Sequence, residues 1–369
     1  MTKPRIIAFY LPQYHSFPEN DEWWGKGFTE WTNVGKAKSL FKGHDQPRVP
    51  TELGYYDLTM PKIREEQARL AREAGIEGFM YWHYWFGGGR TLLTEIIKEV
   101  QESGKPDFPF CIGWANHSWY AKNWNPDGTT SNRLLMEQTY PGIDDAKAYF
   151  DSLLPLFRDK RYITVDGSPL LLIYDPESVP EEYMHLFRKW SVENGFPGIF
   201  FVAYVGNPRI DGEKYIKKGF DMILYQRLTP PSSKIALKAG VLGKVARHMW
   251  RRAAGFLKRR PPFCYRYKDV YPSFVTEMER NVNVAPVILP QWDHSPRSGR
   301  NGIILHDSRP EYFYRHAGMA IKAVEAKPAQ HQLIFLKSWN EWGEGNYMEP
   351  DLTHGRGYIE ALRKAVDEA

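Results

Sequence analysis

The sequence has few of the features that define secreted, membrane-spanning or disulfide-stabilised proteins. It contains only two cysteines among 369 residues, Cys111 and Cys264, and two distant cysteines make no disulfide framework. No apolar run reaches the length needed to cross a bilayer, and no apolar export segment precedes the first predicted strand, which begins by Arg5. We therefore expect a soluble, cytoplasmic protein from a reducing compartment.

Short motifs of several cofactor-dependent enzyme classes are also missing. The chain has no Gly-x-Gly-x-x-Gly string, no Asp-x-Asp string of metal-dependent nucleotide-sugar transferases, and no His-Glu-x-x-His zinc motif. The run Gly87-Gly88-Gly89 lacks the Lys-Ser/Thr of a nucleotide-binding loop, so a turn after a strand explains it better. The sequence therefore predicts neither a metal ion nor a cofactor.

The positive charge of the chain is concentrated in one segment. Lysine plus arginine number 49 and aspartate plus glutamate number 44, which gives a net charge of +5. Nine of the basic residues and none of the acidic ones lie between positions 234 and 260, so the remainder is mildly acidic. Because the excess belongs to one insertion, general affinity for nucleic acid is a poor explanation.

Residues 242–260 of this segment have the pattern of a basic amphipathic helix. Leu242, Val245, Met249, Ala253 and Phe256 recur at steps of three and four, and basic residues recur on the opposite side. Such a helix is typical of an interfacial membrane contact, and equally of a helix that covers a barrel with its basic face in solvent. The lack of acidic residues favours a peripheral contact of 234–260 with an anionic partner: a leaflet, a lipid-linked glycan or an acidic polysaccharide.

Short apolar runs alternate with helical patterns along the chain. Eight strands are predicted, at residues 6–11, 78–84, 110–115, 170–174, 199–205, 222–225, 287–291 and 333–338. Helices are predicted at 61–74, 91–103, 144–158, 181–194, 212–218, 310–326 and 358–369. This rhythm predicts an α/β protein with a single (β/α)8 TIM barrel over residues 1–369. Long segments follow the first, third and sixth strands, and the last of them contains the basic insertion at about 228–283.

The C-terminal end of each predicted strand carries polar or aromatic side chains, and a (β/α)8 barrel assembles its active site from these ends. A single such residue usually only caps a loop, but here all eight strand ends share the feature. Candidates for stacking on a sugar are Trp82, Trp85 and Trp114, although strand alternation directs some of them outward. Candidates for recognising hydroxyl groups are Tyr10, Tyr81, His83, Asn116, His117, Tyr204, Trp292 and Asp293.

The last predicted strand leads into the most informative string of the sequence, Trp339-Asn340-Glu341-Trp342-Gly343-Glu344-Gly345. Two carboxylates three residues apart, walled by two tryptophans whose indole faces can pack against a sugar ring, suit the cleavage of a glycosidic bond. One group donates a proton to the departing oxygen, while the other takes a proton or stabilises positive charge. An isolated Glu-x-x-Glu pair is usually solvated, but the surrounding motif favours catalysis by Glu341 and Glu344.

These residues belong to a pattern that covers nearly the whole chain. With the strings at residues 7–15, 20–31, 78–86, 114–117 and 339–345, the chain resembles the WbsX proteins. Those proteins are glycosyltransferases of bacterial surface-polysaccharide (O-antigen) gene clusters and are similar to glycoside hydrolase family 99. The resemblance implies that Glu341 and Glu344 are the catalytic carboxylates. Gly343 stands where the hydrolases usually have histidine, which puts the substrate in question.

The resemblance also implies a mechanism. Family 99 hydrolases retain the anomeric configuration by letting the substrate's own 2-hydroxyl attack the anomeric carbon. Glu341 is then expected to take the hydroxyl proton, and Glu344 to act first as acid and then as base. The expected function is to cleave or transfer at glycosidic bonds of a surface polysaccharide such as O-antigen. The alternatives are a glycosyltransferase that builds O-antigen from an activated or lipid-linked sugar, and a glycan-binding protein without catalysis.

Overall fold

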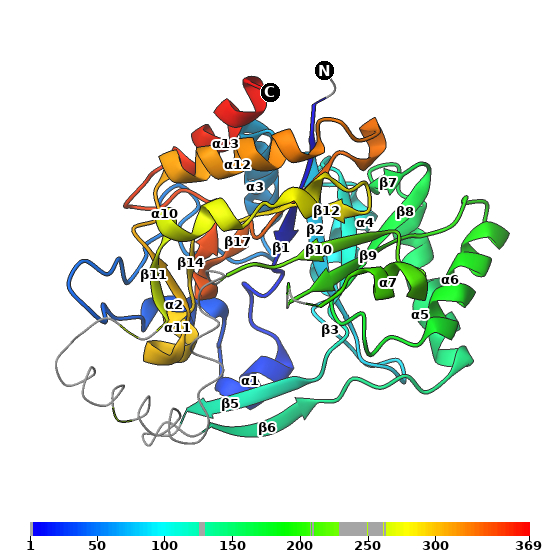
Figure 1. The fold of residues 1–369 in the computed structure, drawn as a ribbon. Helices are drawn as coiled ribbons and strands as arrows, with labels where there is room; N and C mark the ends of the chain where they lie inside the picture. Colours follow the sequence, from blue (N-terminus) through cyan, green and yellow to red (C-terminus); the bar gives the residue numbers. More distant parts are fainter. Residues whose placement is uncertain are drawn as a thin grey trace.

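A computed structural model describes residues 3–124, 130–206, 208, 210–228, 249, 261 and 263–369 of the chain. Within these residues, nine parallel strands form a nearly closed barrel sheet, which confirms the predicted (β/α)8 architecture (Figure 1). In sheet order the strands are β1 (Arg5–Tyr10), β2 (Gly78–Trp85), β4 (Phe110–Trp114), β8 (Ser168–Ile173), β9 (Phe200–Val205), β10 (Met222–Tyr225), β12 (Val284–Ala285), β13 (Val287–Ile288) and β16 (Leu333–Leu336).

The seventh barrel position is divided between β12 and β13, on either side of Pro286. β12 pairs with β10 and β13 pairs with β16, so these two short strands form the two ends of the nearly closed sheet. Proline cannot donate to a β-ladder, which explains the interruption. The carbonyl of Pro286 still accepts a bond from the Phe335 amide at 3.0 Å. The strand predicted at 287–291 is therefore placed wrongly: the position begins at Val284 and ends at Ile288.

Helices surround the barrel much as the sequence pattern predicts. Pro61 starts the first of them, and Gly75, with φ of 85°, ends it. One predicted start is wrong, because residues 91 and 92 pair with β2 as strand β3 before the next helix begins at Glu95. The outer helices are α3 (Pro61–Ala74), α4 (Glu95–Ser103), α5 (Ile143–Phe157), α6 (Glu181–Glu193), α7 (Glu213–Lys218), α12 (Pro310–Val324) and α13 (Gly357–Asp367). In Figure 1, α12 packs beside α13, and α5 beside α6.

Side chains of the barrel strands alternate between the interior and the helix layer. Phe9 of β1 packs in the interior, where its ring centroid lies 5.2 Å from that of Trp82 and 6.0 Å from that of Phe335. The next residue, Tyr10, faces outward and donates a hydrogen bond to Gln67 of α3 at 2.7 Å. Both faces of the sheet are buried, as expected for parallel strands covered by helices. This alternation decides which strand residues reach the functional site.

The loops at the C-terminal ends of the strands carry most of the remaining elements. They include α1 (Pro18–Trp24) and α2 (Glu30–Gly35) after β1, and the hairpin of β5 (Trp119–Trp124) and β6 (Thr130–Met136) after β4. The others are β3 (Thr91–Leu92), β7 (Thr164–Val165), β11 (Cys264–Arg266), α10 (Tyr267–Val270), η2 (Tyr271–Ser273), η3 (Glu277–Arg280), β14 (Trp292–Asp293), α11 (Ser295–Ser298), η4 (Gly299–Asn301), β15 (Ile304–His306), η5 (Ala329–His331), β17 (Asn340–Glu341), η6 (Trp342–Glu344) and β18 (Asn346–Tyr347).

Two sequence predictions concern membranes. The amphipathic segment predicted at 242–260 lies outside the described residues, apart from Met249. In the ranges that are described, no helix has both the length and the apolar character that crossing a bilayer demands.

Candidate active site

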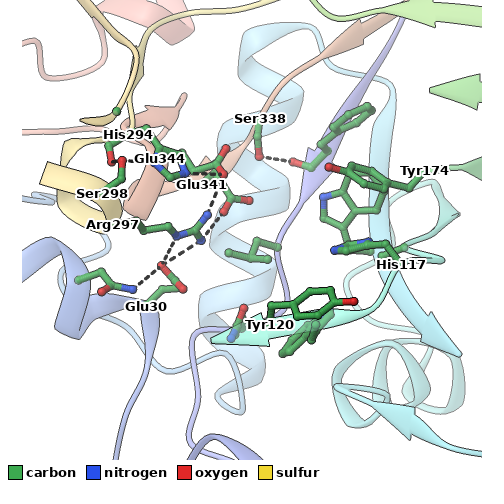
Figure 2. A pocket seen from close by; sticks show the side chains of 18 of the residues that line it. Glu30, His117, Tyr120, Tyr174, His294, Arg297, Ser298, Ser338, Glu341 and Glu344 are labelled. Atoms are coloured by element: carbon green, nitrogen blue, oxygen red, sulfur yellow. Dashed lines mark hydrogen bonds and ion pairs between the residues drawn. The ribbon is translucent and has the colours of Figure 1, made fainter. Parts of the chain in front are cut away.

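A cavity of about 1020 Å³ opens at the C-terminal ends of the barrel strands, bordered by residues of β2 and those that follow β1, β4, β8 and β16. Figure 2 shows Glu30, His294, Arg297, Glu341 and Glu344 gathered on one wall, with His117, Tyr120 and Tyr174 on the other. Its aromatic lining consists of Phe9, Trp24, Phe28, Trp82, Tyr84, Trp119, Tyr120, Tyr174 and Trp292. Its ionisable lining includes Glu30, Lys36, His117, His294, Arg297, Lys337, Glu341 and Glu344.

Backbone contacts with the first strand fix the segment that carries the two predicted glutamates. The Trp339 amide donates to the Phe9 carbonyl at 2.8 Å. Asn340 accepts from the Leu11 amide at 2.8 Å and donates to the Leu11 carbonyl at 3.0 Å. Tyr14 completes the attachment, because its hydroxyl accepts from the Trp342 amide at 3.0 Å. The segment that carries the two glutamates is thus held by β1 and the residues that follow it, and is not a free loop.

The two tryptophans of this segment pack in the protein interior behind the site and do not line the cavity. Trp339 and Trp342 are almost fully buried. Trp342 stacks on Tyr347, with ring centroids 3.6 Å apart, and its indole N–H donates to Glu349 at 2.6 Å. The expectation that these indoles form the walls of a sugar site is therefore wrong. Cavity aromatics come instead from other loops, such as Trp119 and Tyr174.

Arg297 of α11 binds three carboxylates at once (Figure 2). Its guanidinium contacts Glu341 Oε1 at 2.6 Å and Glu344 Oε1 at 2.8 Å. It also contacts Glu30 Oε2 at 3.0 Å, and Asn33 donates to the same oxygen at 3.3 Å. The geometry explains why position 343 is glycine, because a Cβ there would lie 2.2 Å from Glu30 Oε2 and 3.0 Å from Arg297 Nε. One guanidinium therefore brings both predicted catalytic groups together.

The surroundings of the two glutamates separate their pKa values. Burial, with the negative charges of Glu344 and Glu30, raises the pKa of Glu341 to about 7, although Arg297 opposes the shift. Burial also acts on Glu344, but there His294, Arg297 and Lys337 outweigh it and lower the pKa. The His294 Nε2 atom lies 3.6 Å from Glu344 Oε1. Because the pKa of Glu341 is raised and that of Glu344 is lowered, the pair binds its first proton as the pH falls through about 7.

A second buried carboxylate, Glu349, orders the layer beneath the site. It accepts hydrogen bonds from Trp342 at 2.6 Å, from Gln67 at 2.7 Å and from Tyr56 at 2.9 Å. Burial raises the pKa of Glu349 to about 7 despite these donors. Because Trp342 lies between the two site glutamates in sequence, Glu349 fixes the turn that separates them.

Asp293 anchors the short helix that presents Arg297. Its carboxylate accepts from Gln46 at 2.6 Å, lies 2.8 Å from His44 Nε2, and accepts from the Ser295 amide at 2.9 Å. Burial acts to raise the pKa of Asp293, but these bonds and the charge of Arg48 lower it to about 2. The loop between α2 and α3 is thereby tied to the start of α11.

Five of the predicted site residues line the cavity, namely Glu341, Glu344, His117, Trp292 and the stacking candidate Trp82. The His117 ring packs against Tyr174, with centroids 4.7 Å apart.

The structure does not bring the other predicted residues to the cavity wall, because strand alternation directs most of them into the helix layer. Tyr10 and Tyr81 pack on one another, and His83 stacks on Tyr149 of α5. Trp114 and Trp85 also pack against that helix. Burial lowers the pKa of His83 to about 4. These side chains have protein partners in place of a ligand.

Three further candidates lie near the cavity but bind the protein itself. Asn116 is buried and holds the turn after β8, accepting from the Asp175 amide at 2.8 Å. Tyr204 lies behind the wall, where it hydrogen-bonds Gln226 and accepts from Lys337 at 2.9 Å. Asp293 is fully buried in the network described above.

Sequence reasoning missed Arg297, Glu30 and Lys337. Arg297 and Glu30 lie in loops, where no periodic pattern marks a side chain as functional. One signal was available, since two buried carboxylates three residues apart require a nearby cation. Nothing in the spacing indicated which of the 49 basic residues supplies it.

Fold and site together define a (β/α)8 barrel with a glutamate pair in an aromatic cavity at its active-site end. The model of the family Glycosyltransferase WbsX matches residues 6–362, and the chain belongs to this family. Two relatives from Xanthomonas campestris pv. campestris, strains B100 and ATCC 33913, are each described as uncharacterized protein WxcX. Both are 36% identical over 374 residues, an alignment that covers 99% of this chain. The chain spans 50% of the length of these relatives.

Two kinds of solved structure are similar in fold. A glycoside hydrolase-like protein has a TM-score of 0.58 at 15% identity, covering 99% of this chain and 94% of the other. The family 99 endo-alpha-mannosidase from Bacteroides thetaiotaomicron, in complex with Bis-Tris propane, has a TM-score of 0.56 at 16% identity, covering 100% and 98%. At these identities the similarity shows a shared fold.

Proposed function

We propose that this protein is a glycan-active enzyme that cleaves or transfers at glycosidic bonds of a bacterial surface polysaccharide such as O-antigen. The observation that carries the proposal is the pair Glu341 and Glu344, bridged by one guanidinium in an aromatic cavity. A protonated and an ionised carboxyl group side by side are what acid–base catalysis at a glycosidic bond needs. The aromatic rings supply faces on which a sugar ring packs.

The proposed reaction proceeds with retention. Glu341 takes the proton of the substrate's 2-hydroxyl, whose oxygen forms a bond to the anomeric carbon. Glu344 gives a proton to the departing oxygen as the glycosidic bond breaks. Water or an acceptor hydroxyl then opens the anhydro-sugar, giving its proton to Glu344, while Glu341 returns one to the 2-oxygen. In the free site the shared proton lies on Glu341, so it must pass to Glu344 first.

A second candidate is glycosyl transfer from an activated or lipid-linked sugar, which the description of the family favours. Product analysis separates the two. We expect the purified protein, incubated with the surface polysaccharide of its own host, to yield fragments or rearranged chains whose first-formed anomer retains its configuration. A first-formed product of inverted configuration, followed by NMR, would discard this mechanism. Consumption of a nucleotide sugar without any cleavage would favour the second candidate.

The pH dependence of turnover tests the shared proton. The pair holds one proton below about pH 7 and none above it, because burial and the neighbouring carboxylates raise the pKa of Glu341 to about 7. We therefore expect kcat/KM on the host polysaccharide to fall above pH 7 with a slope that approaches tenfold per pH unit. This holds whichever glutamate carries the proton. A kcat/KM that rises through pH 7 would contradict a catalytic pair with one shared proton.

Vesicle sedimentation tests the expected membrane contact of residues 234–260, which lie outside the described residues except Met249. Replacing the nine basic residues with glutamine should abolish sedimentation with anionic vesicles, since each contributes about 1 kcal/mol near such a surface. Neutral vesicles are the control, and thermal unfolding checks that the variant is folded. Equal sedimentation of wild type and variant would leave the segment as a barrel-covering element.

A further inference from the structure

Lys337 is a cation on the cavity wall for which the proposed reaction has no use. It follows β16 directly and lines the same cavity as the two glutamates. Its ammonium lies 4.9 Å from the ring centroid of Trp292 and 5.3 Å from that of Tyr204. It donates to the Tyr204 hydroxyl at 2.9 Å. Two aromatic rings and a neutral hydroxyl therefore fix the position of this charge.

Further contacts fix both the backbone of Lys337 and the side chain of Tyr204. Its backbone amide donates to the Ile288 carbonyl at 2.9 Å. Tyr204 stacks on Tyr174, with centroids 5.1 Å apart and an interplanar angle of 15°, and its hydroxyl also hydrogen-bonds Gln226. A lysine side chain normally moves freely, so this packing removes much of the entropy that binding would otherwise cost.

The ammonium has no anionic partner in the described part of the chain. None of the carboxylates there forms an ion pair with it, whereas Arg297 has three such partners. The charge of Lys337 helps to lower the pKa of Glu344. The Oε1 atom of Glu344, however, contacts Arg297 at 2.8 Å. An ammonium has three donors and Tyr204 accepts one of them. Two donors are left at the wall of a partly enclosed cavity, where charge is screened less than in bulk water.

From this geometry we infer that Lys337 binds an anionic substituent of the glycan, either the carboxylate of a sugar acid or a phosphate. The inference rests on the proposed function, because it assigns the class of substrate to the same cavity. It places the charged group of the substrate at the wall of the cavity that also holds Glu344 and Arg297. An acidic glycan would thus be oriented by Lys337 while its neighbouring bond faces the glutamates.

Binding measurements on this 369-residue chain test the inference without requiring turnover. Calorimetric titrations with glucuronate, glucose 1-phosphate and glucose compare a carboxylate, a phosphate and a neutral sugar. We expect one anionic ligand to bind at least about tenfold more tightly than glucose, since a charge-assisted hydrogen bond contributes more than a neutral one. If glucuronate binds more tightly than glucose, the substituent is a carboxylate; if glucose 1-phosphate does, it is a phosphate. This difference in affinity from glucose is called the gap below.

Variants test whether Lys337 causes the difference in affinity between charged and neutral sugars. Lys337→Met should abolish the difference between charged and neutral sugars, and Lys337→Arg should keep most of it. Lys36→Met is the matched control, because Lys36 is an exposed lysine on the same cavity. Equal affinity for the three ligands, or a gap that survives Lys337→Met, would overturn the inference. If Lys337→Met removes the gap but the wild type never acts on a glycan, the proposed function fails and the anion site stands.

Discussion

Replacing either Glu341 or Glu344 with glutamine should reduce kcat on the host polysaccharide by at least about a hundredfold, the lower range for losing a general acid or base. Glutamine keeps the shape of the side chain and removes its ability to exchange a proton. The E341Q variant should keep nearly all of its thermal stability, because glutamine resembles the protonated carboxyl that this position holds near neutral pH.

The matched control for these variants is Glu73→Gln. Glu73 lies on α3 in surface ion pairs with Arg69 and Arg356, and such pairs contribute little to stability. It should therefore retain wild-type turnover and melting temperature. Turnover at the wild-type rate in both E341Q and E344Q would remove the glutamates from the mechanism. Loss of turnover in E73Q as well would point to a general defect of the preparation.

Substitution of Arg297 by methionine should lower kcat/KM by about a hundredfold or more. Breaking a buried charged interaction typically costs about 3–5 kcal/mol, and here three carboxylates lose their common partner. Removing the positive charge also raises the pKa of Glu341. The fall of kcat/KM on the alkaline side should therefore begin at a higher pH in the variant than in the wild type. Kinetics over a pH series measures both effects in one experiment.

Two further variants separate charge from geometry at this position. Arg297→Lys keeps the charge but cannot contact three carboxylates in one plane, so it should restore only part of the activity. Arg309→Met is the control, because Arg309 is half exposed and pairs with Asp307 on the surface. Wild-type kcat/KM and an unmoved pH profile in the R297M variant would mean that the guanidinium has no part in the reaction.

The sequence predicted the architecture well, and the reason is physical. Alternation of apolar strands with helical patterns survives in the sequence because every strand of a parallel barrel must be buried. The same burial hides which side of a strand faces inward, since both faces are apolar. Tyr10 and Phe9 look equally suited to a site, yet only Phe9 reaches the cavity. Five of the eleven predicted binding residues failed to reach the cavity for that reason.

The site itself was predictable only where its residues are contiguous. Glu341 and Glu344 stand three apart in a string of unusual composition, so the pattern and the family resemblance singled them out, and both line the cavity. Arg297 and Glu30 reach the same place from loops that are distant in sequence, and their contact depends on how those loops fold. Asp293 lies near the cavity, as predicted, but its buried carboxylate anchors a loop and does not line the cavity wall. Burial decides between these two roles of a carboxylate.

The residues of the three-carboxylate contact are far apart in the sequence, which determines when the site forms during folding. Glu30 and Arg297 are 267 positions apart, and the Glu341 segment hangs on the first strand. During synthesis Glu30 therefore emerges well before Arg297, and their contact forms only after β16 has docked on β1. Contacts of such long range form late and slowly. A partially folded chain lacks the assembled glutamate pair, so under the proposed function catalytic activity would report that the barrel has closed.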